Sequence, residues 1–214
     1  MKTPLEPLHD CPLCPRLAAF RADNRSKHPD WFNAPVPSFG PLTARLLIAG
    51  LAPGLQGANR TGRPFTGDWA GDLLYDTLLK FDLAKGVYEE RADDSLELVD
   101  CRIANAVRCV PPQNKPEPSE IKTCRQFLIS ELETLPNVKV ILALGKIAHD
   151  STLITLGAKI SAHPFKHGVT YDVGKFQLIS SYHCSRYNTN TGVLTEAMFD
   201  AVVKRAKLAA MVQM

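Results

Sequence analysis

An apolar strand pattern, a glycine-rich loop and a helical pattern follow one another between residues 45 and 80. The loop at 50–68 contains five glycines and two prolines in nineteen residues. This succession is typical of an open α/β sheet, in which ligands bind at the carboxyl ends of the strands. The loop matches neither the phosphate-binding nor the dinucleotide-binding glycine motif. Its exposed amides and the side chains of Asn59, Arg60 and Arg63 offer donors to an anionic or carbonyl-rich ligand; the alternative is a purely structural connection.

Strand and helix patterns alternate along the rest of the chain. Apolar, strand-like runs occur at 45–50, 103–107, 138–144, 169–171 and 176–182, and helical spacing occurs at 70–81, 118–132 and 147–156, with a final helix after residue 191. This alternation predicts a three-layer α/β fold with a central, mostly parallel four-stranded sheet flanked by helices. Because loops after parallel strands emerge at one edge, we expect the loops that begin near Gly50, Asn105 and His183 to meet at one site.

Length and composition suit one compact unit. The 214 residues, 45% of them hydrophobic, can bury one core, so we expect a single domain over 1–214 with residues 1–40 as an irregular arm. A formal net charge of +3 permits nucleic-acid binding without requiring it. No apolar run reaches membrane-spanning length, and the amino terminus lacks the apolar core of a signal peptide. We therefore expect a cytoplasmic protein, in which cysteines are metal-binding or free rather than disulfide-bonded.

Four cysteines have the pattern of a metal site. Cys11 and Cys14 form a C-x-x-C pair, and fourteen residues separate Cys109 from Cys124. Four soft thiolates suit either zinc or an iron–sulfur cluster, and the spacing alone does not choose between them. The alternative is that Cys124 is simply a buried apolar residue on its helix. The two other cysteines are expected to be free thiols: Cys101 and Cys184.

Three further segments occur in a fixed order with these cysteines. They are GLAPG…NRTGRPFTGD at 50–68, NAVRCVPP at 105–112 and HCSRYNTNTG at 183–192. Together they resemble the iron–sulfur uracil-DNA glycosylases of family 5 (type B). Family 4 carries an acidic residue directly after the first glycine of the loop, whereas this chain has Leu51, which points to family 5. The resemblance implies action on double- or single-stranded DNA that contains deaminated bases, and it implies a 4Fe–4S cluster on Cys11, Cys14, Cys109 and Cys124.

A base that has left the DNA stack needs a ring to lie against and a polar group that reads its edge. Phe65 on the loop is suited to stacking, and Asn105 offers a uracil edge both a donor and an acceptor. Their alternatives are a core phenylalanine and an asparagine that caps the backbone at a strand end. The resemblance also assigns Gly50 and Ala52 to the substrate site.

Cleavage of the glycosidic bond leaves negative charge on the departing base, which a donor near the pyrimidine O2 stabilises. His183 is the candidate donor, and a neutral imidazole can donate as well as a charged one; the alternative is a satisfied surface histidine. Asp68 is the carboxylate suited to position the attacking water, and its alternative is a helix N-cap. Asn59 is a second, weaker candidate for the water.

Three arginines lie in the predicted site loops, where they would contact DNA phosphate: Arg60, Arg63 and Arg186. Tyr187, or one of its neighbours, is the candidate to fill the gap that the extruded base leaves.

We therefore predict a monofunctional DNA repair glycosylase that flips uracil out of DNA, hydrolyses its N-glycosidic bond and leaves an abasic site. No lysine in these motifs is placed as a Schiff-base nucleophile, so strand cleavage is not expected. The resemblance implies hypoxanthine and xanthine as additional substrates. One alternative is a non-catalytic iron–sulfur DNA-binding module, and another is a zinc protein that binds a small nucleotide. The protein is expected to act as a monomer on the chromosomal DNA of a prokaryotic-type cell.

Overall fold

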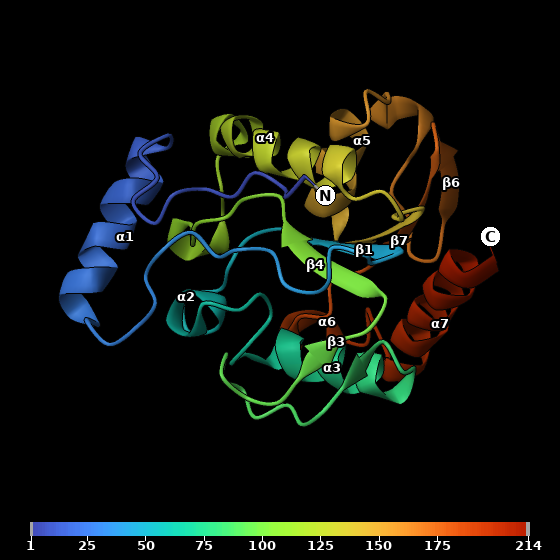
Figure 1. The fold of residues 1–214 in the computed structure, drawn as a ribbon, viewed down its shortest axis with the longest axis horizontal. Helices are drawn as coiled ribbons and strands as arrows, with labels where there is room; N and C mark the ends of the chain where they lie inside the picture. Colours follow the sequence, from blue (N-terminus) through green and yellow to red (C-terminus); the bar gives the residue numbers. More distant parts are fainter. Residues whose placement is uncertain (1, 213–214) are drawn as a thin grey trace.

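A five-stranded sheet runs through the centre of the computed structural model, which describes residues 2–212 (Figure 1). Its strands, in spatial order, are β4 (Cys101–Asn105), β1 (Leu46–Gly50), β5 (Val140–Leu144), β7 (Phe176–Ser181) and β6 (Thr170–Val173). The first four are parallel to one another, and β6 pairs antiparallel with β7. The predicted α/β fold with a mostly parallel sheet is confirmed. The sheet has five strands instead of the predicted four, because the strand around residue 170 also joins it, antiparallel to β7 at the edge.

Helices cover both faces of the sheet, as Figure 1 shows. One pair covers each face: α3 (Trp69–Lys80) with α7 (Glu196–Val212), and α4 (Pro118–Thr134) with α5 (Lys146–Thr155). Side chains alternate along β1, so Leu46 and Ile48 pack toward α3 and α7 while Leu47 and Ala49 pack toward α4 and α5. Burial on both faces explains why the strands read as continuous apolar runs. Within residues 2–212, no helix combines the length and the apolar character that crossing a bilayer demands.

The starts of α3 and α4 are set by local capping groups. The side chain of Asp68 accepts a hydrogen bond from the Gly71 amide at 3.1 Å, which satisfies one of the free donors of the first turn of α3. α4 begins at Pro118, which has no N–H to leave unpaired there. The Glu120 carboxylate accepts from the Glu117 amide at 2.7 Å and closes that turn. These helix starts were readable from the sequence because their causes are local.

The sequence patterns do not predict the short elements around the edge of the sheet. These are α2 (Ala58–Thr61), α6 (Arg186–Asn190), the 3-10 turns η1 (Pro112–Asn114) and η2 (Ile160–Ala162), and the strands β2 (Ala84–Lys85) and β3 (Glu97–Leu98). Elements this short cannot display a periodicity. β2 and β3 form a separate antiparallel pair within the excursion that joins α3 to β4.

The strand predicted at 103–107 is β4, which ends at Asn105. The next two residues leave the sheet, yet their amides donate to the carbonyls of Gly50 and Leu51 at 3.0 and 2.9 Å. Ala106 and Val107 are apolar and buried although they lie outside the strand. This accounts for the predicted strand ending two residues later than β4. The main chains that follow β1 and β4 thus remain bonded to each other beyond the sheet.

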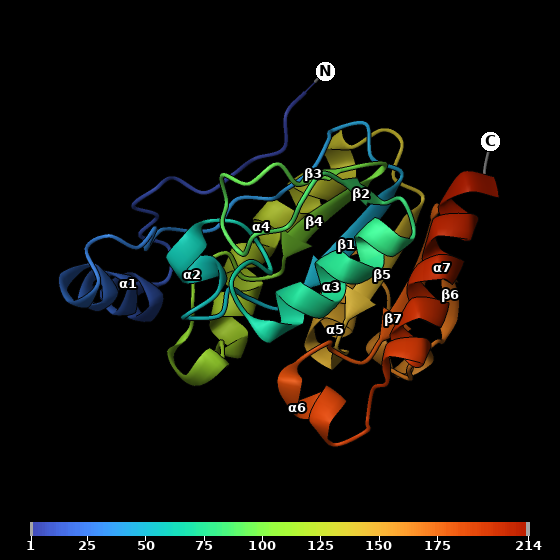
Figure 2. The ribbon, with the colours of Figure 1, turned by 90° about the horizontal axis from the view of Figure 1, so that it is seen from below.

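The amino-terminal arm lies against the body at several points. It carries α1 (Pro15–Lys27), which lies at one end of the molecule beside α2 (Figures 1 and 2). Arg16 donates to both carboxylate oxygens of Glu120 on α4, at 2.8 and 2.7 Å. Further along, Phe39 exchanges two backbone hydrogen bonds with Ile103 of β4, at 2.9 and 2.8 Å. The arm is therefore attached both to a helix and to the edge of the sheet.

Candidate active site

The loops after β1, β4 and β7 meet at the carboxyl edge of the sheet and enclose a cavity of about 360 Å³. This volume lies in the usual range of small-molecule sites. In Figure 2, α2 and α6 lie near this edge. The lining includes six residues that the sequence singled out: Ala52, Phe65, Asp68, Asn105, His183 and Arg186. The expected convergence of the three loops is therefore observed.

Gly50 ends β1 at the point where two site side chains approach its backbone. A Cβ at this position would lie 2.2 Å from Asn105 Oδ1 and 2.8 Å from the ring of Phe65. Both separations are far inside van der Waals contact, so only glycine leaves room for the amide and the ring. Gly50 therefore allows the two side chains to stand next to each other at the cavity.

Phe65 holds an unusual backbone conformation. Its φ of +53° lies in the left-handed region, which costs a residue with a side chain about 1–3 kcal/mol. The side chain is only 8% exposed, and its ring centroid lies 6.0 Å from that of His183, with 26° between the planes. The ring is thus packed into the protein and also lines the cavity, so the core and stacking interpretations are compatible.

Asn105 is the last residue of β4 and is 3% exposed. Its Oδ1 is shielded from solvent and has no hydrogen-bond partner among residues 2–212. Leaving a buried acceptor unpaired costs about 1–3 kcal/mol, so an unpaired oxygen on a residue that lines a cavity indicates a group that a ligand donor would satisfy. The alternative role, capping of the backbone, is not fulfilled by this oxygen.

His183 lies two residues after the end of β7. Its carbonyl accepts a hydrogen bond from Asn188 Nδ2 at 2.8 Å, which holds the start of the loop. Desolvation lowers the pKa of His183, and the negative charge of Asp68 opposes that shift. The imidazole is therefore neutral near pH 7, where one ring nitrogen donates and the other accepts.

The two carboxylate oxygens of Asp68 face different neighbours. Oδ1 caps α3, as described above, so the N-cap interpretation is correct for that atom. Oδ2 lies against the glycine loop, where a Cβ at Gly57 would be 2.2 Å away and one at Gly54 would be 2.8 Å away. Both glycines therefore leave space for this oxygen beside the cavity. Capping by one oxygen does not prevent the other from orienting a water.

Asn59 is less well placed for catalysis. It is 1% exposed and is absent from the cavity lining. Its Nδ2 donates to Asn33 Oδ1 at 2.9 Å, which links α2 to the amino-terminal arm. Its Oδ1 has no partner within the part of the chain that the structure describes. The contact with Asn33 indicates a role in holding the arm.

The three candidate arginines have different environments. Arg186 is exposed, lines the cavity and lies over the Trp69 ring, with 5.9 Å from the guanidinium carbon to the ring centroid. Arg60 is exposed, and its Nε donates to the Gln56 carbonyl at 2.8 Å. Arg63 is 4% exposed and its guanidinium is bound by the Asp94 carboxylate. The prediction that Arg63 contacts phosphate is therefore corrected: its charge is buried and already paired.

Trp69 lines the cavity and is 48% exposed, although the sequence motifs do not single it out. Its Nε1 donates to Thr189 Oγ1 at 3.0 Å, so the indole bridges α3 and α6. An aromatic residue directly after the candidate carboxylate was the available signal. Tyr187 is 74% exposed on α6 and is not part of the lining, and its role in filling the DNA gap stays a prediction.

Four cysteines from the arm, the segment after β4 and α4 line one small cavity: Cys11, Cys14, Cys109 and Cys124. Burial raises the pKa of Cys109 to about 11 and that of Cys124 to about 12. The Arg21 guanidinium donates to Cys109 Sγ at 3.4 Å and the Arg108 amide donates to Cys124 Sγ at 3.3 Å, and such donors favour thiolates. Within residues 2–212, no three metal-binding side chains are gathered closely enough to hold one ion. The remaining two cysteines are buried elsewhere: Cys101 and Cys184.

Known proteins resemble this chain over most of its length. A family model described as the uracil DNA glycosylase superfamily matches residues 37–207. A type-5 uracil-DNA glycosylase of Thermus thermophilus is 46% identical over 210 residues, which is 95% of either chain. A type-5 enzyme of Pyrobaculum aerophilum is 37% identical over 203 residues, covering 93% of this chain and 88% of its own. A type-4 uracil-DNA glycosylase of Thermotoga maritima is 33% identical over 147 residues, covering 68% and 67%.

Proposed function

The chain belongs to the uracil-DNA glycosylase superfamily, and from this we propose that its cavity takes up a deaminated base extruded from DNA and that its side chains hydrolyse the N-glycosidic bond. It is a DNA repair glycosylase, a monofunctional hydrolase of the kind that removes uracil. One observation carries the assignment of the site: Phe65, Asn105 and His183 line the same cavity, and the buried Oδ1 of Asn105 has no hydrogen-bond partner among the described residues.

Base recognition begins with extrusion, which costs roughly a few kcal/mol because stacking and pairing are lost. The flipped ring would lie against Phe65. The polar edge of uracil would then face Asn105, whose Oδ1 accepts from the ring N3–H and whose Nδ2 donates to a ring carbonyl. Pairing the buried oxygen of Asn105 offsets part of the extrusion cost.

Bond cleavage requires stabilisation of the negative charge on the departing base. His183 is neutral in its desolvated position, so one ring nitrogen carries the hydrogen that can be donated to the pyrimidine O2. A donor already in place when charge develops needs no reorganisation at the moment of reaction. We therefore assign His183 the role of the electrophilic donor.

Hydrolysis is completed by a water on the opposite side of the sugar. We assign its orientation to Asp68, because Oδ1 is held by the Gly71 amide and this fixes the direction of Oδ2. Asn59 is a weaker candidate because it is not part of the cavity lining. No lysine lines the cavity within the described residues, which supports base release without strand cleavage.

The first loop residue bears on the range of lesions. Leu51 and Ala52 line the cavity with apolar side chains, and Leu51 stands at the position where family 4 has an acidic residue. Apolar side chains in the wall exclude water but form no hydrogen bond that would select a pyrimidine over a purine. We therefore propose that hypoxanthine and xanthine are accepted in addition to uracil.

The cysteine cavity fits a 4Fe–4S cluster. Four thiols converge there, and two of them receive hydrogen bonds that favour their ionised form. A cluster held by these cysteines would cross-link the arm to α4 and supply stability. On this proposal residues 1–214 act as one domain, with residues 1–40 as an arm anchored by the cluster.

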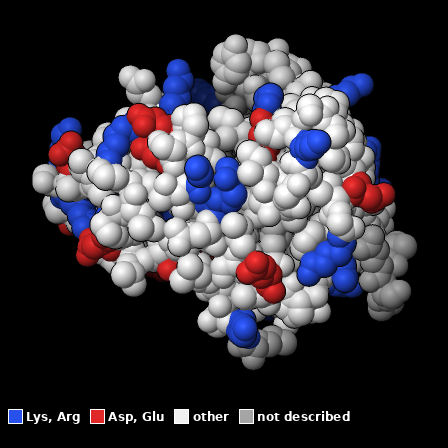
Figure 3. All heavy atoms as spheres, turned by 90° about the horizontal axis from the view of Figure 1, so that it is seen from above, with Lys and Arg blue, Asp and Glu red and all other residues white. Residues whose placement is uncertain are grey.

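We propose that only a few positively charged side chains near the cavity contact the DNA phosphates. Lys and Arg are interspersed with Asp and Glu on the face shown in Figure 3, and the formal net charge is only +3. Arg60 and Arg186 are the proposed phosphate contacts, in double- or single-stranded DNA bound by a monomer. Removing one such contact lowers the slope of log affinity against log salt by about one. Arg186→Gln is expected to show that change for damaged and undamaged duplexes alike.

The decisive experiment is a lesion panel. Purified protein is incubated with duplexes that contain uracil, hypoxanthine or xanthine, and base release is followed before and after alkali treatment. We expect alkali-dependent breaks for the wild type and greatly reduced release by His183→Ala. Absence of release from all three duplexes would contradict the proposed function, and breaks without alkali would contradict a monofunctional mechanism.

A further inference from the structure

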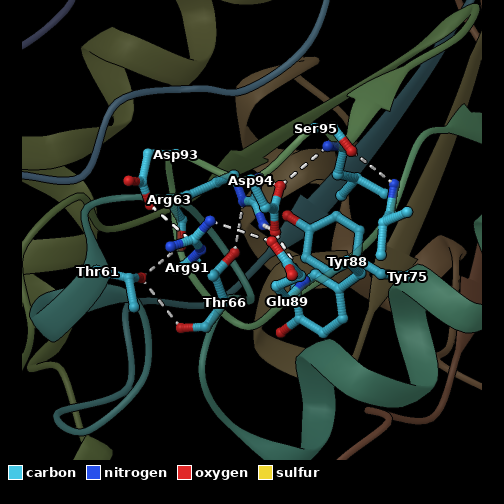
Figure 4. A network of polar contacts seen from close by, with 12 residues as sticks. Thr61, Arg63, Thr66, Tyr75, Tyr88, Glu89, Arg91, Asp93, Asp94 and Ser95 are labelled. Carbon is cyan, nitrogen blue, oxygen red and sulfur yellow. Dashed lines mark hydrogen bonds and ion pairs between the residues drawn. The ribbon is translucent and has the colours of Figure 1, made fainter.

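A network of polar side chains connects the loop that carries Phe65 to the segment between α3 and β4, and Figure 4 shows these side chains. At its centre the guanidinium of Arg63 donates to both carboxylate oxygens of Asp94, each at 2.7 Å. The side chain of Arg63 is 4% exposed and that of Asp94 is 0% exposed. Neither residue lines the substrate cavity. The base-binding and hydrolytic steps described above therefore leave this buried ion pair without a role.

Arg63 also reaches the loop that carries Phe65. Its Nε donates to Thr66 Oγ1 at 2.8 Å, and that hydroxyl lies 3.2 Å from the Pro64 carbonyl and can donate to it. Pro64 and Thr66 flank Phe65, whose φ is +53°. The guanidinium therefore holds Thr66 directly and Pro64 through the Thr66 hydroxyl, on the two sides of the left-handed Phe65.

Two tyrosines complete the support of this loop. The Tyr75 hydroxyl donates to the Pro64 carbonyl at 2.6 Å, and the Tyr88 hydroxyl accepts from the Gly67 amide at 3.1 Å. Their ring centroids lie 5.3 and 5.7 Å from the guanidinium carbon of Arg63, within cation–π range. The rings thus surround the charge of Arg63 while their hydroxyls hold the loop backbone.

Asp94 connects the loop to the excursion between α3 and β4. Its carboxylate also accepts from the amides of Glu89 and Leu96, each at 3.0 Å. Burial disfavours the charged carboxylate, but the hydrogen bonds from Arg63 and from these amides lower the pKa of Asp94 to about 2. Asp94 is therefore ionised throughout the neutral pH range, and the pair does not depend on pH there.

We propose that Arg63 and Asp94 are positioning residues for the stacking ring: the ion pair keeps Phe65 in its left-handed conformation, and so keeps the ring in the wall where a flipped base would lie. A left-handed phenylalanine persists only when its surroundings determine it. Without the pair, the loop would relax and the ring would leave the wall. The inference rests on the proposed function, since it requires a base to stack.

The first test uses Asp94→Asn, which keeps the shape of the side chain and removes its charge. We expect kcat for uracil release from duplex DNA to fall roughly 10- to 100-fold, as a displacement of about 1 Å would cause. Affinity for undamaged duplex is expected to stay unchanged, because the exposed arginines that contact phosphate are untouched. Arg63→Lys keeps the charge but cannot form the two-pronged pair, and we expect the same kinetic pattern.

A double-mutant cycle separates positioning from general stability. If the pair acts through the ring, Asp94→Asn has little further effect once Phe65→Ala has removed the ring. The matched control is Glu131→Gln, which breaks the buried pair with Arg102 on the opposite face of the sheet, where Arg102 Nε lies 2.8 Å from Glu131. Glu131→Gln and Phe65→Ala are expected to act independently, so the fold-change in kcat of the double variant should equal the product of the two single fold-changes.

If the fold-change in kcat of the Asp94→Asn/Phe65→Ala double variant equals the product of the two single fold-changes, the positioning role is contradicted. The cycle is repeated with Arg63→Lys if Asp94→Asn loses its near-ultraviolet circular dichroism. Both cycles start from an active wild type. A wild type that releases no base therefore contradicts the proposed function, whereas an active wild type with uncoupled variants contradicts only the positioning of Phe65.

Discussion

The imidazole of His183 stands 6.0 Å from the ring of Phe65, measured between centroids, with the planes inclined by 26°. His183 follows β7, while Phe65 lies on the loop after β1, so the parallel sheet brings together two side chains that are distant in sequence. On the proposed function, a base stacked on Phe65 would therefore lie next to the imidazole of His183.

His183→Ala is expected to lower the single-turnover rate of uracil release about 100- to 1,000-fold, the usual effect of removing one donor to a developing anion. Duplex affinity should change little, because the imidazole acts mainly on the departing base. His183→Gln retains a donor and is expected to recover part of the rate. An unchanged rate in His183→Ala would remove the histidine from the mechanism.

Asp68→Asn separates the two functions of this side chain. Asparagine is as good an N-cap as aspartate, so we expect the thermal midpoint to stay close to that of the wild type. Base release should fall roughly 100-fold or more, because the amide cannot take up a proton from the water. Asp68→Ala is the matched variant and should also lose about 1 kcal/mol of stability. Full activity of Asp68→Asn would show that the carboxylate serves only as a cap.

Gly50→Ala is expected to raise KM for uracil-containing DNA strongly. The new Cβ would lie 2.2 Å from Asn105 Oδ1 and 2.8 Å from Phe65, so one of the two must move. Overpacking of this kind costs about 1–3 kcal/mol of stability. Gly157→Ala is the control: its φ is +72° and nothing lies within 4 Å of the new Cβ, so it should lose stability through backbone strain and keep its activity.

The free energy of unfolding is expected to fall as the pH drops below about 6.5. Desolvation lowers the pKa of His149, of His167 and of His183 in the folded protein. Between those lowered values and the unfolded value of about 6.5, the unfolded chain binds more protons, so acid favours unfolding. Urea titrations between pH 5 and pH 8, on the order of five conditions, would measure the slope.

His149 is the best single test of that slope, because it is fully buried and its Nδ1 lies 2.7 Å from Ser180 Oγ. His149→Gln should flatten the pH dependence, because it removes one of the groups whose pKa is lowered in the folded protein. A slope that His149→Gln does not alter would exclude this histidine as a source of the acid sensitivity.

Cys124→Ser is expected to lower the iron content and the visible absorbance of the purified protein. Loss of the cluster should also make the amino-terminal arm more susceptible to proteolysis, because the link from the arm to α4 is removed. Cys101→Ser is the matched control, since Cys101 is buried away from that cavity and its thiol donates to the Leu83 carbonyl at 3.2 Å. Equal iron content in both variants would refute the four-cysteine site.

The sheet and the meeting of the three loops were predictable because both depend on local patterns. Buried strands such as Val140–Leu144 read as apolar runs, and parallel topology then places their loops at one edge. The sequence also presented Asp68 with two alternatives, a cap and a catalytic carboxylate. In the structure, one oxygen of Asp68 caps α3 and the other lies beside the glycine loop. The sequence cannot show which oxygen has which neighbour.

The environment of Arg63 was not predictable. Its partner Asp94 is 31 residues away, in an excursion without periodicity, and only the folded chain brings the two charges together. An arginine in a glycine-rich loop reads as a surface cation, and burial with an ion partner reverses that interpretation. The position of Trp69 is not predictable for a similar reason, because its contact with Thr189 joins residues that are 120 positions apart in the sequence.

The segments after β1 and β4 stay joined past the end of the sheet through hydrogen bonds to the carbonyls of Gly50 and Leu51. These hydrogen bonds fix the backbone at residue 51 and at Asn105 relative to each other, so a new side chain at position 51 would alter the chemistry of the pocket without moving the amide of Asn105. The single substitution Leu51→Asp would place a carboxylate in the wall of the cavity. Lesion preference in such proteins can thus diverge by exchange of one side chain, with the architecture conserved.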